Sequence, residues 1–252
     1  MSGVVAAVVS FVKQLRFEVA KNAQFSKHGQ ARAVYLALGL GVTFGVGLGL
    51  VLSGSALSLL GWFAMFQVAF HVWEFTFNAL FHPQKLSSSD FLLPWQHSNE
   101  FLYAFVAALV EYFVELLLFG WLKQSRLVFA VALLMCAAFQ TLRTVAMYTA
   151  ASNFTHQIAE HKTESHELVT TGIYAYLRHP SYCGWFWWAI GTQLLLANPI
   201  CTIGYAVASW RFFDDRIRYE EATLREYFGE NYVKYAVRVG TGIPFIRGIV
   251  PQ

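Results

Sequence analysis

The sequence predicts an all-α fold: a polytopic bundle of membrane helices followed by a cytosolic C-terminal helical segment. Of its 252 residues, 56% are hydrophobic and only 13% are charged, and the mean hydropathy is +0.44. Soluble domains carry about 25% charged residues, so this chain falls well short of them. Several apolar runs are also long enough to cross a bilayer. Together these observations exclude an ordinary soluble domain.

Apolar run length locates about six membrane helices. Residues 31–81 are too long for one span, and the small residues of Ser53–Ala56 are the natural turn between two. A polar segment with prolines and serines, residues 82–100, predicts a loop before spans over 101–121 and 127–149. Residues 182–197 and 200–213 are shorter and are separated by Asn198 and Pro199, which indicates a helical hairpin.

The distribution of basic residues predicts the orientation, because cytosolic segments are enriched in lysine and arginine. An even number of spans places both termini on the same side, and both terminal segments are basic, so we expect both in the cytosol. Residues 150–181 then also face the cytosol. Lys123 and Arg126 depart from the rule, since they fall in a short loop on the opposite side.

Ionisable residues within the spans need partners, because a charge at membrane depth costs at least about 2.5 kcal/mol. Glu111 and Glu115 are four residues apart and share a helix face, and Arg143 in the next span could pair with one of them. They could form a substrate pathway or proton relay, or an ion pair that holds helices together. The same two interpretations apply to His71 and Glu74.

The sequence predicts neither a metal site nor a disulfide. The three cysteines, Cys136, Cys183 and Cys201, lie in apolar surroundings without paired spacing, so we expect free thiols. His156, His161 and His166 recur every five residues, which suits neither a helix face nor a strand face. The net charge of +3 is too small to indicate nucleic-acid binding.

A polar segment runs directly into a tryptophan-rich one at residues 166–188. Pro180 restricts His179 to extended backbone, and Ser181 could cap the helix that follows. The free backbone N–H groups of that first turn could bind a ligand carboxylate. Alternatively, Ser181 only caps a membrane helix and His179 packs at the level of the lipid headgroups.

The segment from Trp210 to Tyr232 predicts an amphipathic helix that ends at Gly229. At about 100° per residue, one face combines apolar side chains with two charged ones, Arg216 and Glu220. That face comprises Phe213, Arg216, Ile217, Glu220, Leu224, Tyr227 and Phe228, whereas Asp214, Asp215, Arg218, Arg225 and Glu226 fall on the opposite half. Arg216 and Glu220 could pair with each other or bind ligands.

Three stretches of the chain closely resemble the isoprenylcysteine carboxyl methyltransferase family. Two of them are HELVTTGIYAYLRHPSYCGWFWWAIGTQLLLANPIC and WRFFDDRIRYEEATLREYFGENYVKYAVRVGTGIPFI, and the third is FLLPWQHSNEFLYAFVAALVEYFVE. The resemblance covers at least residues 140–248. It implies methyl transfer from S-adenosylmethionine, which leaves S-adenosylhomocysteine, to the C-terminal carboxylate of a prenylated cysteine. The acceptors would be Ras-like and other CaaX proteins at the endoplasmic reticulum membrane.

The resemblance also implies roles for individual residues. Arg216 would bind the substrate carboxylate, and Arg216 and Glu220 would be the catalytic pair. The residues implied for the cofactor are Ala159, His166, Glu167, Leu168, Val169, Tyr174, His179, Pro180, Ser181, Tyr182 and Glu220. Ala159 stands where vertebrate members have glutamine, so any contact there would involve the backbone. We expect residues 1–149 to form the N-terminal membrane helices and residues 150–252 the catalytic region.

Three other classes of protein share parts of this pattern. A phospholipid N-methyltransferase would use the same cofactor, but a buried arginine does not suit an amine acceptor. An NADPH-dependent membrane sterol reductase resembles the C-terminal end, but it needs a basic cluster for the 2′-phosphate that this chain does not show. A transporter could use Glu111, Glu115 and Arg143, and it would not bind S-adenosylmethionine.

Overall fold

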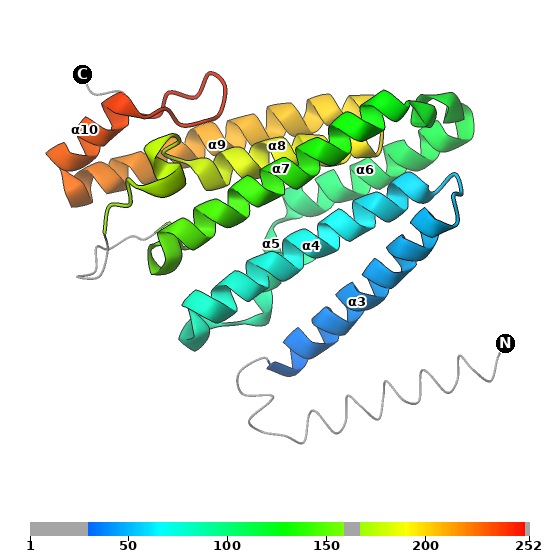
Figure 1. The fold of residues 1–252 in the computed structure, drawn as a ribbon, viewed down its shortest axis with the longest axis horizontal. Helices are drawn as coiled ribbons and strands as arrows, with labels where there is room; N and C mark the ends of the chain where they lie inside the picture. The colour runs from blue at the N-terminus through cyan, green and yellow to red at the C-terminus, as the bar shows by residue number, and fades with distance from the viewer. Residues whose placement is uncertain (1–29, 159–166, 250–252) are drawn as a thin grey trace.

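The computed structural model describes residues 30–158 and 167–249, and the described chain is a bundle of long helices (Figure 1). The long helices are α3 (Gln30–Leu52), α4 (Ser58–Phe81), α6 (Asn99–Leu118), α7 (Arg126–Ala150), α8 (Pro180–Leu195) and α9 (Pro199–Phe228). The shorter ones are α5 (Pro94–His97), α10 (Glu230–Arg238) and the 3₁₀ turns η1 (Pro83–Lys85), η2 (Ser88–Phe91), η3 (Gly120–Gln124), η4 (Ala151–Asn153) and η5 (Gly172–Ala175).

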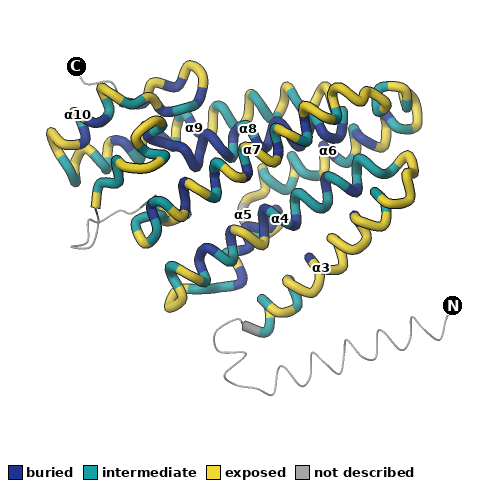
Figure 2. Tube along the Cα trace, viewed as in Figure 1, coloured by how far each residue is buried: buried dark blue, intermediate teal, exposed yellow. Residues whose placement is uncertain are grey.

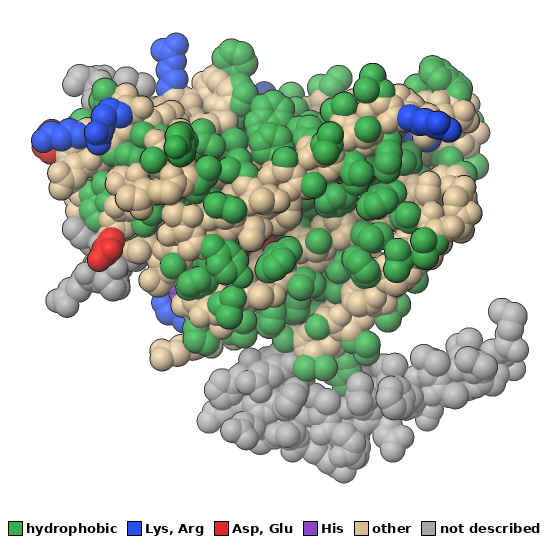
Figure 3. All heavy atoms as spheres, in the orientation of Figure 1, with side chains coloured by type: hydrophobic (Ala, Val, Ile, Leu, Met, Phe, Trp, Pro, Cys, Tyr) green, Lys and Arg blue, Asp and Glu red, His purple; other side chains and the backbone are tan. Residues whose placement is uncertain are grey.

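Each of the six long helices overlaps one predicted span, and α9 extends well beyond its span. Within residues 30–158 and 167–249, three stretches are long and apolar enough to cross a membrane: Ala31–Leu52, Asn99–Leu118 and Arg126–Asn153. Of the other three helices, α8 is only 16 residues long, and α4 carries His71 and Glu74. Hydrophobic side chains cover the middle of the face seen in Figure 3, and basic side chains lie toward its edges, as expected for a molecule surrounded by lipid.

Helix α9 joins two predicted segments. The sequence predicted a short span over 200–213 and an amphipathic helix over the segment from Trp210 to Tyr232. The structure has one helix of 30 residues, about 45 Å long, that ends at Gly229 with a φ of 54°. Its first half is apolar and its second half carries the charged residues, so one rigid element connects the membrane to the polar end of the bundle.

Close backbone packing brings α8 against α7. A Cβ atom added to Gly184 would lie 2.8 Å from the backbone nitrogen of Arg143, and one added to Gly191 would lie 3.1 Å from the Cys136 sulfur. Small residues allow membrane helices to approach this closely. Figure 2 shows the result: α8 is buried along most of its length, whereas α3 is largely exposed.

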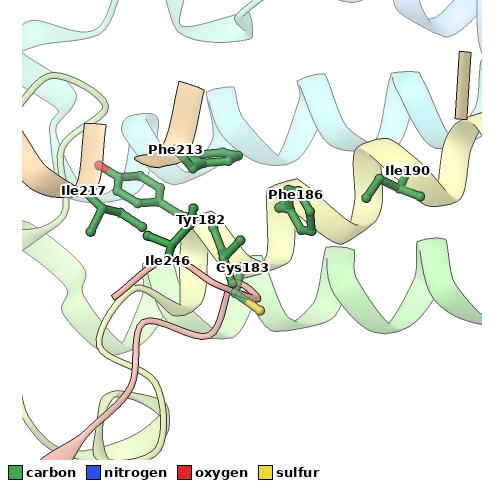
Figure 4. Packing of buried hydrophobic residues seen from close by; sticks show 8 residues of the cluster. Tyr182, Cys183, Phe186, Ile190, Phe213, Ile217 and Ile246 are labelled. Carbon is green, nitrogen blue, oxygen red and sulfur yellow. The ribbon is translucent and has the colours of Figure 1, made fainter. Parts of the chain in front are cut away.

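The main hydrophobic cluster joins α8, α9 and the segment after α10 (Figure 4). Its buried members are Tyr182, Cys183, Phe186, Ile190, Phe213, Ile217, Ile243 and Ile246. The segment after α10 is also held by the backbone, because Arg178 N donates to Gly240 O at 2.9 Å. The hairpin of α8 and α9 is therefore fixed from outside by later residues of the chain.

The buried charges of the bundle pair differently from the prediction. Arg143 pairs with Glu74, not with Glu111 or Glu115. Glu115 pairs with Lys123 at 2.6 Å, and Glu111 accepts hydrogen bonds from the first backbone N–H groups of α9, at Ile200 and Cys201. These contacts hold helices together, which agrees with the structural interpretation of the two glutamates. They also explain why Lys123 departs from the orientation rule.

The cysteines are free, as predicted. Cys136 and Cys183 are buried, and Cys201 is partly exposed.

Candidate active site

A cavity of about 150 Å³ opens at the end of the bundle where α7 ends and α8 begins. The second half of α9 and helix α10 close its other sides. The cavity is lined by Ala150, Asn153, Phe154, Thr155, Gln157, Ile158, Glu167, Leu168, Val169, Tyr174, Arg178, His179, Pro180, Ser181, Tyr182, Glu220, Thr223, Leu224, Tyr227, Phe228, Tyr232 and Tyr235. It therefore combines carboxylate and imidazole groups with a largely aromatic wall.

Most of the residues implied for the cofactor meet at this cavity. The structure brings together Glu167, Leu168, Val169, Tyr174, His179, Pro180, Ser181, Tyr182 and Glu220, from four separate segments. Ala159 and His166 lie outside the described residues. Because these segments are up to 53 residues apart in sequence, counted from Glu167 to Glu220, only the fold could bring them to one place.

Arg216 lies beside the cavity, one turn of α9 before Glu220. Its Nε donates to the Tyr182 hydroxyl at 2.9 Å, and its Nη2 donates to the His156 carbonyl at 2.5 Å. Its guanidinium group also lies 5.4 Å from the centre of the Tyr182 ring. Within the described chain Arg216 and Glu220 form no ion pair, so the simple i, i+4 salt bridge is not the reason that both lie on this face.

Tyr182 is the side chain that connects the arginine with the cavity. Its ring stacks on His179, with centroids 5.5 Å apart and planes at 2°, and on Phe213 at 5.2 Å (Figure 4). These aromatic neighbours fix the hydroxyl that accepts from Arg216. The orientation of Arg216 is therefore set by packing as well as by hydrogen bonds.

The carboxyl group of Glu220 is available to a ligand. Its Oε2 atom is buried and has no hydrogen-bond partner within the described chain, and the imidazole Nδ1 of His179 lies 3.8 Å away. Burying an acceptor without a hydrogen-bond partner costs free energy, because the acceptor loses its hydrogen bonds to water. A ligand with a hydrogen-bond donor or a positive charge would recover that loss.

The start of α8 differs from its prediction in one respect. The residue before the helix is His179, with Pro180 as the first helical residue, and no side chain caps the end. Ser181 was expected to cap, but its Oγ instead accepts a hydrogen bond of 2.7 Å from Arg143. The first-turn backbone N–H groups of Ser181 and Tyr182, which both line the cavity, are thus left for a ligand.

Sequence reasoning missed a buried ion pair beside the cavity, between Arg178 and Glu221. Arg178 Nε donates to Glu221 Oε1 at 2.5 Å, and His179 Nε2 lies 3.0 Å from the same oxygen. Burial alone would raise the pKa of the Glu221 carboxyl, but the hydrogen bonds and charges of His179 and Arg178 lower it to about 2. The helical wheel contained the signal, because Glu221 falls at about 80° from Phe213, beside the apolar face.

Tyrosine hydroxyls complete the wall contributed by α10. Tyr235 donates to the backbone carbonyl of Tyr174 at 2.6 Å, which joins α10 to η5 across the cavity. Burial raises the pKa of Tyr235 to about 12 and also raises the pKa of Tyr174. Both hydroxyls therefore stay protonated at neutral pH, and that of Tyr235 acts as a hydrogen-bond donor.

Known proteins resemble this chain in sequence and in structure. The family model for the isoprenylcysteine carboxyl methyltransferase (ICMT) family matches residues 130–226. The chain is 45% identical over 210 residues to the protein-S-isoprenylcysteine O-methyltransferase of Xenopus laevis, covering 83% of this chain and 72% of the relative. It is 43% identical over 228 residues to the enzyme of that name from Dictyostelium discoideum, covering 90% of this chain and 94% of the relative.

A solved structure shares the fold. It is described as the eukaryotic intramembrane Ras methyltransferase ICMT, and it matches with a TM-score of 0.86 at 37% identity, over 97% of this chain and 87% of that one. The fold, the cavity and these likenesses define a methyltransferase embedded in a membrane. The chain belongs to the isoprenylcysteine carboxyl methyltransferase family.

Proposed function

We propose that this protein transfers a methyl group from S-adenosylmethionine to the C-terminal carboxylate of a prenylated cysteine. The main support for the proposal is that Arg216 and Glu220 lie one turn apart on α9. Each has a polar atom without a hydrogen-bond partner in the described chain, which a ligand could bind. Of the three guanidinium nitrogens of Arg216, Nε and Nη2 bond to the protein, and Nη1 has no partner within the described chain.

The cavity fits the proposed methyl donor. The donor carries a sulfonium charge, an ammonium group and a carboxylate. The unpartnered Glu220 oxygen suits the positive groups, and the free N–H groups at Ser181 and Tyr182 suit the carboxylate. Leu168 and Val169 add apolar surface. When bound, the donor would supply a methyl group activated by the adjacent positive sulfur.

The acceptor needs no general base. A C-terminal carboxyl group has a pKa of about 3.5, so at neutral pH it is already an ionised nucleophile. The protein has to hold this carboxylate, align it and exclude water. Arg216 would hold it by charge-assisted hydrogen bonds, and the buried rings of Tyr182 and Phe213 beneath the arginine would keep water away.

The position of Arg216 also suits an acceptor with a lipid tail. Arg216 is closer than Glu220 to the apolar half of α9, so the acceptor side of the site lies toward the membrane and the donor side toward the cavity. We propose that the prenyl chain enters from the bilayer between helices. The acceptors would be Ras-like and other CaaX proteins, at the endoplasmic reticulum membrane, with both termini and the catalytic region of residues 150–252 on the cytosolic side.

The test is transfer of a tritiated methyl group to N-acetyl farnesylcysteine by the purified protein in detergent. Arg216→Ala should abolish transfer while binding of S-adenosylhomocysteine, measured by calorimetry, persists. Glu220→Ala should weaken that binding. Arg218→Ala is the matched control, because Arg218 lies on the same helix but is 59% exposed and, among the described residues, pairs with Asp214 alone. Wild-type activity in both Arg216→Ala and Glu220→Ala would refute the proposal.

A further inference from the structure

The buried carboxylate of Glu74, in α4, forms hydrogen bonds with Arg143 and His156. Arg143 contacts Ser181 on the donor side of the site, and the His156 carbonyl contacts Arg216 on the acceptor side. Glu74 Oε1 accepts from Arg143 Nε at 2.5 Å, and Glu74 Oε2 accepts from Arg143 Nη2 at 2.9 Å and from His156 Nε2 at 2.5 Å. The side chains of Glu74 and Arg143 are each 1% exposed. A protein in which apolar side chains of similar size replace a buried ion pair is often equally or more stable. Stability alone therefore does not account for the charges of Glu74 and Arg143.

The first branch runs from Glu74 through Arg143 to the donor side. Arg143 Nη1 donates to Ser181 Oγ at 2.7 Å, and the guanidinium group lies 4.8 Å from the centre of the Trp185 ring. Because Nε and Nη2 both donate to Glu74, the planar guanidinium group is held in a single orientation. Ser181, in the first turn of α8, is therefore fixed from behind the cavity by a residue that does not line it.

The second branch runs from Glu74 through His156 to the acceptor side. The imidazole ring of His156 is held by Glu74 and by Asn78, whose Nδ2 lies 3.2 Å from His156 Nδ1. The backbone carbonyl of the same histidine accepts from Arg216 Nη2 at 2.5 Å. A shift of this ring would move the carbonyl that orients the arginine.

We propose that Glu74 is a positioning residue that sets the distance between the two reacting groups, acting on Ser181 through Arg143 and on Arg216 through His156. The inference rests on the proposed function. In-line transfer needs the reacting atoms about 3–3.5 Å apart, and a misplacement of about 1 Å can cost about 100-fold in rate. A single anion bonded to both branches holds Ser181 and Arg216 at a fixed distance from each other.

The bundle offers a matched control in the pair of Glu115 and Lys123. This ion pair is also buried, with side chains 9% and 4% exposed, and it also joins separate elements. It lies at the other end of the helices, at the turn between α8 and α9, and contacts no residue of the cavity. Loss of either pair should lower stability, but only loss of the Glu74 pair should change the chemistry.

The experiment compares Glu74→Gln, His156→Ala, Arg143→Lys and Glu115→Gln in the full-length protein. For each, kcat and KM for N-acetyl farnesylcysteine, the Kd for S-adenosylhomocysteine and the melting temperature are measured. His156→Ala should raise the KM for the prenylcysteine about tenfold with an unchanged Kd, and Arg143→Lys should raise the Kd with less effect on that KM. Glu74→Gln should lower kcat by about tenfold or more.

Several results would overturn the proposal. One is wild-type kinetics in Glu74→Gln at a temperature where the protein is folded. Another is an equal effect of both branch variants on both ligands, or the same kinetic loss in Glu115→Gln. If Glu74→Gln does not fold, the two branch variants decide the matter by themselves. Failure of the proposed function would instead appear as activity retained in Arg216→Ala, whatever the Glu74 variants do.

Discussion

The ammonium group of Lys123 donates a hydrogen bond of 2.6 Å to the carboxylate of Glu115 at the end of the bundle away from the cavity. It also donates to Leu196 O, Ala197 O and Asn198 Oδ1, each at 3.0 Å. Three of these four acceptors belong to the turn that connects α8 to α9. One lysine therefore fixes the turn from which both helices run toward the site.

Lys123→Met should destabilise the protein without removing its chemistry. The substitution leaves Glu115 buried and unpaired, and breaking a buried ion pair costs about 3–5 kcal/mol. The melting temperature in detergent should fall, while kcat at a low, permissive temperature should stay near the wild-type value. A fall in kcat without a fall in melting temperature would contradict this. Lys85→Met, at an exposed position in η1, is the control.

Tyr182→Phe should reduce catalytic efficiency toward the prenylcysteine. The ring keeps its stacking on His179 and Phe213, but the hydroxyl that accepts from Arg216 Nε is lost. Hydrogen bonds to charged groups contribute about 1.5–3 kcal/mol, so kcat/KM should fall by about tenfold or more. Steady-state methyl-transfer assays measure the effect. Unchanged kcat/KM would mean that the hydroxyl does not orient the arginine.

Gly184→Ala should loosen the contact between α7 and α8. The added methyl group would lie 2.8 Å from both the backbone nitrogen and the Cβ atom of Arg143, so the helices would have to separate. Overpacking of this kind costs about 1–3 kcal/mol. Gly204→Ala is the matched control, since no atom lies within 4 Å of the added methyl group and alanine favours a helix. Thermal unfolding of both variants should show a loss only for Gly184→Ala.

Stability should fall in acid because of Glu221. Its pKa is lowered from 4.5 to about 2 in the folded protein, so its contribution is fully present above pH 4.5 and is lost as the pH falls toward 2. Glu221→Gln should flatten this part of the profile of unfolding midpoint against pH. Glu226→Gln, at an exposed position of the same helix, should leave it unchanged. Parallel acid profiles for the wild type and Glu221→Gln would exclude this role.

The helices could be predicted from the sequence because membrane spans are read from apolar run length. The turn at Ser53–Ala56, the break at Asn198–Pro199 and the helix end at Gly229 were confirmed, since each depends on local backbone chemistry. Nine of the 22 residues that line the cavity had been singled out through the motifs that carry the family resemblance, and their roles stay predictions. The motifs do not include the lining residues between Ala150 and Ile158, and they do not show how the segments meet.

Partner choice among buried charges could not be predicted. The sequence offered Glu111 or Glu115 to Arg143, but the structure pairs Arg143 with Glu74. Run length fixes where a helix begins and ends, and it carries no information on which helices are neighbours or how they are rotated. The contact between Arg216 and the His156 carbonyl was hidden for the same reason, because any residue type could supply that carbonyl.

The contacts of Arg178 impose an order on the assembly of this protein. Its guanidinium group bonds to Glu221, 43 residues later, and to the carbonyls of Val239 and Arg247, the last of them 69 residues later. During synthesis the Arg178 side chain stays hydrated until the α8–α9 hairpin has inserted into the bilayer and its partners at residues 221, 239 and 247 have been made. Contacts so distant in sequence form late in folding, so the newly made bundle should pass through a stage in which its helices are inserted but its pocket is still open to water.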